Sequence, residues 1–283
     1  MNGNTQKKSL RADPFSLVMR VLVWGAALLT AGVLLALIAY ILIRGVPNLK
    51  LSLFELEYNS ENVSMFPSIV MTIYMTVLTL IITTPLGIGC AIYLTEYAKR
   101  GNKVVEVIRL AAETLSGIPS IVYGLFGMLF FVTALQWKNS ILAGSCTLAI
   151  MVLPLIIRSP EEALKSVPDS YREASFGLGA GKLRTVVRVV LPPAMPGIVA
   201  GVILAVGRIV GETAALIYTA GTVAKITINP MESARTLAVH MYALSSEGLH
   251  TNEAFATGVV LLLVVLMLNA TSNAIAKRIT KGK

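Results

Sequence analysis

Arg208 and Glu212 have the clearest capacity for chemistry, because both lie inside an apolar run, Gly197–Ala220. A charge near the middle of a membrane helix costs about 2.5–3.5 kcal/mol on insertion scales, so such residues face a bundle interior or a water-filled cavity. The guanidinium of Arg208 is planar, permanently charged and forked, which suits an oxyanion such as phosphate. The four-residue spacing predicts that both side chains share one helix face. Two interpretations stay open: the pair serves an anion, or it only neutralises itself.

A second patterned group lies in a long polar loop, where Glu173-Ala174-Ser175 is followed by Gly179 and later by Leu191-Pro192-Pro193. Glu173 falls near the start of a short helix, where a carboxylate suits the positive end of the dipole. Ala174 and Ser175 are small enough for another protein to approach closely. Gly179 permits a tight turn, and proline cannot continue a helix. The loop is therefore predicted to be a helix, a glycine turn and a basic helix that stops at Leu191-Pro192-Pro193.

This spacing resembles the coupling loop of ABC-importer permeases, whose pattern is Glu-Ala-Ala, a spaced Gly and Ile-x-Leu-Pro. Ser175 stands for the second Ala and Val189 for the Ile. In that family the loop docks on a separate ATPase and passes on its movement. The resemblance implies the following residues for ATPase coupling: Glu173, Ala174, Ser175, Gly179, Leu191 and Pro192. The alternative is an ordinary glycine-rich loop between helices.

The composition is that of an integral membrane protein. The 283 residues are 55% hydrophobic and only 14% charged, with a mean hydropathy of +0.74, whereas soluble domains carry about 25% charged residues. Six apolar runs approach the ~20 residues that a bilayer requires. The predicted spans are Val21–Ile43, Ser68–Thr95, Ile118–Leu135, Ile141–Ile157, Gly197–Ala220 and Ala254–Ala276. The first run is too long for a signal peptide, so we expect a retained helix.

The distribution of Lys and Arg predicts the orientation. These residues gather before the first span, after the second, after the fourth and after the last, and they are sparse in the other loops. Both termini and the Glu173 loop are therefore expected in the cytoplasm. The resemblance to importer permeases implies that the membrane is a bacterial cytoplasmic (inner) membrane. The net charge is +9, but no basic folded face supports nucleic-acid binding.

Prolines and glycines occur within several of the predicted spans. Pro85 is predicted to interrupt the second span and Pro154 the fourth, while Pro119 opens the third. Gly207 and Gly211 form a small-xxx-small pair, which lets membrane helices approach closely. Packing inside the helical bundle is the expected role of most of these glycines.

No enzyme site is predicted. The segment from Gly177 to Lys182 looks like a phosphate-binding loop, but that loop needs glycine where Phe176 stands and Ser or Thr where Leu183 stands. Hydrophilic segments hold no nucleophile–base set. The cysteines and histidines are isolated from one another, so no metal site is expected; they are Cys90, Cys146, His240 and His250. We expect no cofactor on this chain and ATP hydrolysis on another.

A closer resemblance appears in four motifs. Residues 207–215 and 118–127 resemble the span-five and span-three signatures of PstA-type permeases of phosphate ABC importers, and residues 85–98 resemble their span two. Asn229-Pro230-Met231 and Thr236-Leu237-Ala238 resemble their external loop. The similarity runs from about Phe66 to the C-terminus. The external loop and the short N-terminal region favour the PstA branch over its PstC partner.

This resemblance implies an all-α, six-helix permease with the type I ABC-importer fold. The chain then divides into two parts. Residues 1–65 hold the N-terminal cytoplasmic tail, the first transmembrane helix and an external loop, and residues 66–283 form the permease core of five transmembrane helices. The coupling loop lies in this core at about residues 159–196. The implied partners are a PstC-like permease, an ATPase dimer and an external phosphate-binding protein. The implied substrate pathway contains Arg208, Glu212, Thr213 and Ser120.

Three alternatives remain at this level. Another oxyanion, such as molybdate or sulfate, suits a midplane arginine equally well. A stand-alone channel or secondary transporter would lack an ATPase-docking loop and usually has internal repeats, and the sequence shows the loop and no repeat. A signalling role in addition to transport is compatible with every motif.

Overall fold

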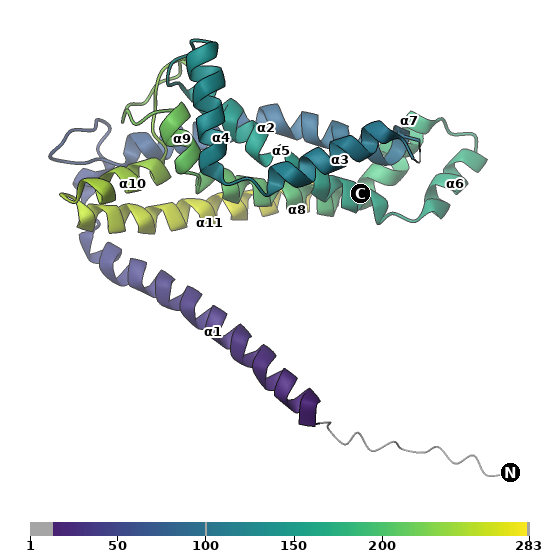
Figure 1. Cartoon of the computed structure of the whole chain (residues 1–283), viewed down its shortest axis with the longest axis horizontal. Helices are drawn as coiled ribbons and strands as arrows, with labels where there is room; N and C mark the ends of the chain where they lie inside the picture. The colour runs from purple at the N-terminus through teal and green to yellow at the C-terminus, as the bar shows by residue number, and fades with distance from the viewer. Residues whose placement is uncertain (1–13, 100, 282–283) are drawn as a thin grey trace.

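The structure, a computed structural model, describes residues 14–99 and 101–281. Within these residues it is helical, with no β-strand, as the sequence predicts (Figure 1). The N-terminal cations Lys7, Lys8 and Arg11 lie outside the described residues. In chain order the helices are α1 Pro14–Gly45, α2 Phe66–Ile92, α3 Lys103–Ser116, α4 Ser120–Gly127, α5 Ile141–Lys165, α6 Asp169–Gly177, α7 Lys182–Thr185, α8 Leu191–Val210, α9 Ala214–Thr219, α10 Leu237–Glu247 and α11 Thr251–Lys281.

Short π-helical and 3-10 segments extend several of these helices. The π segments are η3 Tyr93–Tyr97 after α2, η4 Met128–Ala134 after α4 and η5 Val186–Val190 between α7 and α8. Two 3-10 turns, η1 Val46–Asn48 and η2 Leu51–Phe54, follow α1. A π segment changes the helical register without ending the helix. As a result, Lys182–Val210 forms one apolar run of 29 residues.

Five helical runs of the described chain are long and apolar enough to cross a membrane, or six if one bent pair counts as a span. The bent pair is the predicted third span with the helix before it: Lys103–Ser116 and Ser120–Ala134 meet at 105°. The run Ser120–Ala134 lies within the predicted third span Ile118–Leu135, and the bend falls at its start, where Pro119 was predicted to open it. Proline restricts the residue before it to extended conformations and lacks an N–H, so Gly117-Ile118-Pro119 breaks the helix. The amphipathic α3 was not predicted.

The other prolines behave differently from the prediction. Pro85 lies inside α2 and Pro154 inside α5, and both helices continue through them. Pro192 and Pro193 do not stop the basic helix but occupy the first turn of α8, where a missing N–H leaves no bond unmade. Inside a membrane, a broken helix would expose more unsatisfied backbone groups than the one carbonyl that a proline frees, which favours continuous helices.

Helix α5 is the centre of the bundle. Of its apolar stretch 67% is buried, against 0% for α1. Glycines let its neighbours approach: a Cβ on Gly87 of α2 would meet Ile156, and one on Gly201 of α8 would meet Ser159. Both contacted residues belong to α5. Small residues at such crossings allow the van der Waals contact that drives association in lipid.

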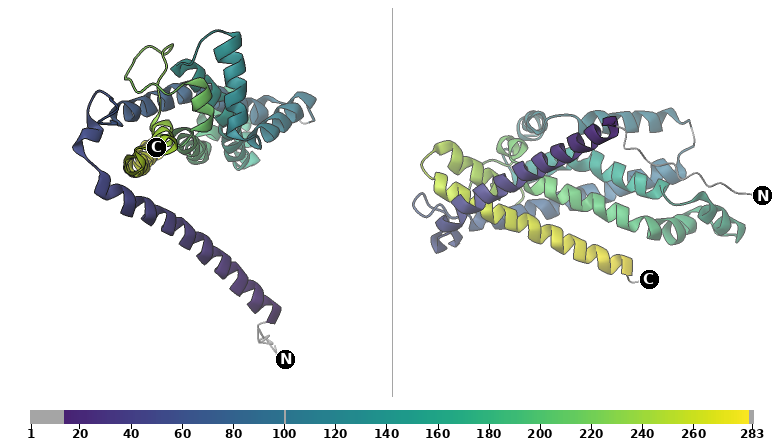
Figure 2. Two further views of the ribbon diagram at one scale, coloured as in Figure 1. Left: turned by 60° about the vertical axis from the view of Figure 1, so that its left-hand side comes forward. Right: turned by 90° about the horizontal axis from the view of Figure 1, so that it is seen from below.

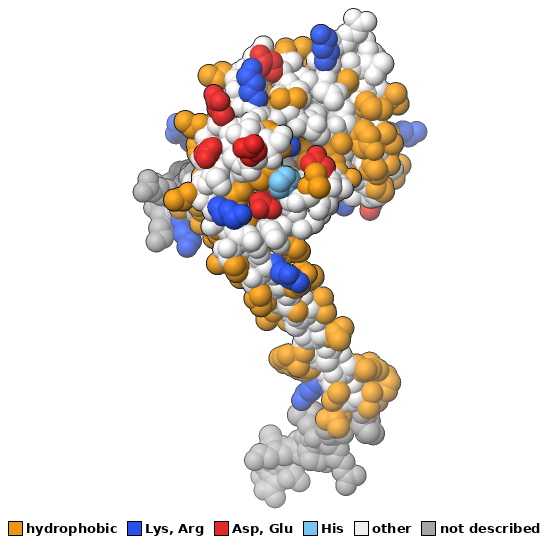
Figure 3. Space-filling view, turned by 90° about the vertical axis from the view of Figure 1, so that its left-hand side faces the viewer, with side chains coloured by type: hydrophobic (Ala, Val, Ile, Leu, Met, Phe, Trp, Pro, Cys, Tyr) orange, Lys and Arg blue, Asp and Glu red, His pale blue; other side chains and the backbone are white. Residues whose placement is uncertain are grey.

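Helix α1 leaves this bundle. It touches the rest mainly near its C-terminal end, where Tyr40 packs edge-on against Phe255 of α11 with 5.6 Å between ring centroids, and it then diverges from the other helices (Figure 2). Its hydrophobic side chains are exposed along its length (Figure 3). The bundle has two ends, which we name the α6 end, with α6 and α7, and the α10 end, with α10 and the segment 46–65 (Figure 1).

We predict that Gly87→Val destabilises the bundle and that Gly89→Val does not. A Cβ at Gly87 would lie 2.6 Å from Cγ2 and 3.0 Å from the backbone oxygen of Ile156, whereas one at Gly89 has nothing within 4 Å. Both changes have the same effect on helix propensity. The difference in stability between the two variants therefore measures the overpacking at Gly87, which costs about 1–3 kcal/mol. Thermal unfolding in detergent measures it. Equal melting temperatures for the two variants would contradict a close α2–α5 contact.

Candidate functional site

The predicted helix, glycine turn and basic helix are present at the α6 end. Gly179 has φ +80°, a left-handed conformation that favours glycine. The buried hydroxyls of Ser175 in α6 and Thr185 in α7 lie 2.8 Å apart and hold the two helices together. We call α6, the turn at Gly179 and α7 the α6 hairpin. Ser175 faces the inside of this hairpin, while Glu173 and Ala174 are exposed.

A groove of about 520 Å³ runs along this hairpin. It is lined by small and apolar residues with one cation: Tyr171, Ala174, Ser175, Leu178, Gly179, Ala180, Arg184 and Val189. Leu191 is not on this surface, because it packs against a buried cluster that contains Leu164 and Val190. The predicted coupling residues therefore separate into two groups. Ala174, Ser175 and Gly179 line the groove. Leu191 and the partly buried Pro192 form the first turn of α8 instead.

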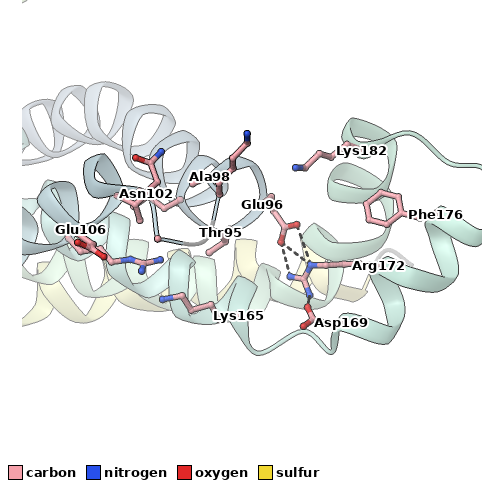
Figure 4. Close-up of a pocket in the computed structure, with 15 residues that line it drawn as sticks. Thr95, Glu96, Ala98, Asn102, Glu106, Lys165, Asp169, Arg172, Phe176 and Lys182 are labelled. Atoms are coloured by element: carbon pink, nitrogen blue, oxygen red, sulfur yellow. Dashed lines mark hydrogen bonds and ion pairs between the residues drawn. The ribbon is translucent and has the colours of Figure 1, made fainter.

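A buried ion pair ties this hairpin to the bundle (Figure 4). Arg172 of α6 donates to Glu96 of η3, with an Nη2–Oε1 distance of 2.7 Å and Nε distances of 3.2 Å to both carboxylate oxygens. The same guanidinium donates to the carbonyls of Val167 at 2.8 Å and Leu164 at 3.0 Å, and to Asp169 at 3.2 Å. The hydrogen bond to Glu96 raises the pKa of Arg172. The arginine therefore stays charged and saturated with acceptors.

This pair joins three parts of the chain. Glu96 lies on η3, which continues α2, and the carbonyls of Leu164 and Val167 belong to the end of α5 and the turn after it. Arg172 thus fixes the hairpin to both central helices. The sequence analysis missed this residue, since its partner lies 76 residues away and nothing in the local sequence pairs them.

A pocket of about 640 Å³ surrounds the ion pair of Arg172 with Glu96 and extends to α3 (Figure 4). On its far side Arg109 of α3 and Lys165 of α5 share the carboxylate of Glu161, each at 2.7 Å. The ion pairs at this end join α3 to α5 and α6 to η3. The pocket therefore lies between helices that ion pairs cross-link.

The charged residues of the predicted pathway are arranged differently from the prediction. Helix α8 ends at Val210, and Glu212 lies in the break before α9. The Glu212 carboxylate accepts the backbone N–H of Ala215 at 3.1 Å, so it is drawn to the first turn of α9, where N–H groups lack helical partners. In the described residues Arg208 and Glu212 form no ion pair within 4.0 Å. The shared helix face was therefore wrong.

Arg208 lies on a bare face of α8. Leu204, one turn earlier, is 61% exposed, and a Cβ on Gly207 would meet nothing within 4 Å. Gly211 is exposed as well. Gly207 and Gly211 therefore do not pack inside this bundle, contrary to the expectation from their spacing. The face they form is free for contact outside the chain.

Ser120 and Thr213 lie near the break between α8 and α9. Thr213 precedes α9, and Ser120 begins α4. One turn along α4, a Cβ on Gly124 would lie 2.8 Å from Cα of Ala215, so the first turns of α4 and α9 are packed together. Tyr123 of α4 also lies within electrostatic reach of Arg208. Helix α9, which follows Glu212 and Thr213, is therefore packed against α4, the helix that Ser120 begins.

Comparison with known proteins shows which family the chain belongs to. Residues 83–282 match the family described as binding-protein-dependent transport system inner membrane component. The chain is 36% identical over 273 residues to the probable ABC transporter permease protein YqgI of Bacillus subtilis, covering 90% of this chain and 92% of that protein. It is 40% identical over 141 residues to the phosphate transport system permease protein PstA 1 of Mycobacterium tuberculosis, covering 50% of this chain and 46% of that protein.

Solved structures share the fold. A chain of the MetNI methionine ABC transporter in an inward-facing conformation aligns with a TM-score of 0.59 at 20% identity, covering 86% of this chain and 98% of that chain. A chain of a bacterial ABC transporter that imports the acidic polysaccharide alginate aligns with a TM-score of 0.66 at 17% identity, covering 94% and 99%. The predicted type I importer fold is thereby confirmed.

We predict that Arg172→Gln loosens α6. The change leaves Glu96 largely buried without its cation, and breaking such a pair costs on the order of 3 kcal/mol. Hydrogen exchange of the α6 amides should accelerate, while the α5 core stays protected. Arg188→Gln is the matched control, because Arg188 is exposed and forms no ion pair in the described part of the chain. An unchanged rate of hydrogen exchange in α6 after Arg172→Gln would show that the Arg172–Glu96 ion pair does not hold the hairpin.

Proposed function

The chain belongs to the family of binding-protein-dependent transport system inner membrane components, and on that premise we propose that it is the permease subunit of an ATP-driven importer of inorganic phosphate. It is a multi-pass membrane protein of an ABC importer. The phosphate assignment is supported by relatives named as PstA permeases, whereas YqgI is named only as a probable ABC permease. Molybdate or sulfate is the alternative substrate.

The observation that carries the proposal is the α6 hairpin with its groove. An importer permease needs a surface for the ATPase and a rigid connection from that surface to the spanning helices. Ala174 and Gly179 line a groove wide enough for a partner side chain. Arg172 connects the same hairpin to Glu96 and so to α2. Movement of a docked ATPase is thereby passed to the bundle as a rigid-body motion.

We place the substrate path along the bare face of α8, against a PstC-like second permease. Arg208 there presents a cation to the space between the two subunits, and a forked guanidinium suits two oxygens of phosphate. Glu212 is held by Ala215 instead, which leaves the charge of Arg208 available to the anion. The hydroxyls of Ser120 and Thr213 supply further donors at the junction.

The orientation follows from the same proposal. The α6 end lies in the cytoplasm with the two ATPase subunits, and the α10 end faces the external phosphate-binding protein. Both termini are cytoplasmic. ATP hydrolysis belongs to the partner ATPase, and this subunit carries neither cofactor nor catalytic residue. The exposed apolar side chains of α1 face lipid or the second permease.

We predict that Arg208→Gln lowers the maximal rate of phosphate uptake roughly tenfold or more, the scale of one lost charge-assisted interaction. The half-saturating phosphate concentration should change little, because capture belongs to the binding protein. Arg208→Lys keeps the charge without the fork and should retain partial activity. Uptake by cells that express equal amounts of assembled transporter measures these effects, and Lys138→Gln, an exposed cation at another loop, serves as control. Full uptake by the double variant Arg208→Gln with Glu212→Gln would refute a transport role for Arg208.

A single cysteine experiment tests the partners and the orientation together. In a background without Cys90 and Cys146, Ala174→Cys should crosslink to the ATPase, and Ile228→Cys, at an 86% exposed position, should react with an impermeant maleimide on intact cells. Ala174→Trp should block the groove and uncouple ATP hydrolysis from uptake. Copurification should recover the ATPase and a second permease. External labelling at 174, or coupled uptake by the Trp variant, would contradict the assignment.

A further inference from the structure

Arg235 is a buried cation at the α10 end that forms no ion pair with the carboxylates of the described residues. The residue is 6% exposed, and its Nε and Nη2 are buried without a hydrogen-bond partner among the described residues. A buried charge without a partner is strongly unfavourable unless an anion compensates it. Glu232, three residues earlier in the chain, pairs with Lys225 at 3.6 Å instead.

Two nitrogens on one edge of the Arg235 guanidinium, Nε and Nη2, have no acceptor in the described residues. The ring of Tyr58 lies over the Arg235 Cζ at 4.4 Å from its centroid, which covers one face of the plane and fixes its orientation. Nε and Nη2 form the side-on edge of the fork, whose two N–H groups are parallel. That edge matches two oxygens of one oxyanion. Tyr58 therefore orients a donor pair whose acceptor is not supplied by the described chain.

His240 is a second buried polar side chain within electrostatic reach of Arg235. It is fully buried and lies edge-on to Tyr58 with 6.1 Å between ring centroids. Neither ring nitrogen forms a hydrogen bond of good geometry in the described residues, although an interaction with the backbone of Val63 acts to raise its pKa. Burial and the positive charge of Arg235 lower its pKa to about 3. His240 is therefore neutral at physiological pH and keeps one N–H to donate without adding a repelling charge.

The segment that carries Tyr58 is strained where it returns to the bundle. Val63 has φ +40° and is 3% exposed. A β-branched residue rarely adopts this conformation, and such strain concentrates at ligand clamps and switch regions. Because Arg235 is almost fully covered, an ion reaches the fork only when this segment moves. The strain offers a reason why that movement is accessible.

From these observations we propose that Arg235 and His240, with Tyr58 as the stacking partner, form an oxyanion-binding site at the α10 end, distinct from Arg208. The choice of phosphate as its ligand rests on the proposed function. In an importer, a site at this end receives the anion before it reaches the junction of α8 and α9. Arg235 and His240 donate to the phosphate oxygens, and Tyr58 keeps the guanidinium plane in place.

The test is phosphate binding to the assembled transporter in nanodiscs, without the binding protein, measured with radiolabelled phosphate at constant ionic strength. Arg235→Met should weaken binding at one class of site about 10- to 100-fold, the scale of a lost charge-assisted pair. Arg44→Met is the matched control, since Arg44 also stacks on a tyrosine, Tyr40, yet is exposed. Unchanged phosphate binding by a folded Arg235→Met complex would overturn the site.

A second arm does not depend on the folding of the Arg235 variant. Phosphate should still bind to, and thermally stabilise, the Arg208→Gln complex, because the two sites are separate. Loss of all phosphate binding in Arg208→Gln would overturn the inference and leave the proposed function intact. Arg235-dependent binding of sulfate or molybdate in place of phosphate would support the oxyanion site and overturn the phosphate assignment instead.

Discussion

The close contact of α5 with α2 and α8 is the constraint on which the rest of the structure depends. Lipid is as apolar as the side chains it surrounds, so burial of apolar area contributes little, and helices associate through close van der Waals contact. Gly87 and Gly201 provide that contact by admitting Ile156 and Ser159 of α5. Every other element is placed relative to these three helices, including the hairpin at one end and the helix break at the other.

Charge is distributed according to what each end must do. At the α6 end several carboxylates are paired with cations of other helices, as in Arg172 with Glu96 and Arg109 with Glu161. Such cross-links make that end rigid enough to pass on a movement. Arg208 lies inside a membrane-spanning helix and Arg235 is buried, yet neither is paired with a carboxylate in the described residues. An unpaired guanidinium near a membrane is costly, which is the physical reason for assigning both to a mobile anion.

The subunit also presents surfaces that its own chain does not cover. Helix α1 has no buried apolar stretch, and a Cβ on Gly207 of α8 would meet nothing of the described chain within 4 Å. Both features fit the proposed assembly, in which a second permease and lipid complete the packing. The same logic accounts for the broken helix at Gly211, since irregular backbone at membrane depth is tolerated where it lines a cavity or protein.

Composition and local pattern alone determined the membrane class, the approximate helices and the hairpin around Gly179, because hydropathy, glycine and proline act through short-range physics. Motif spacing also indicated the permease family. Local pattern failed at Pro85 and Pro154, where the cost of breaking a helix in lipid outweighs the loss of one hydrogen bond. It also failed at Pro192, which lies in the first turn of α8, where a missing N–H leaves no bond unmade. It failed again at Glu212, which leaves the α8 helix because the first turn of α9 offers it an N–H.

Only the tertiary structure decided which distant residues meet. Glu96 and Arg172 lie 76 residues apart, and Tyr58 and Arg235 come from opposite ends of the sequence. A sequence pattern holds no information about such pairs, because their distance is set by how the helices pack and not by the chain between them. For the same reason the bare face of α8 could be recognised only after the packed faces of its neighbours were known.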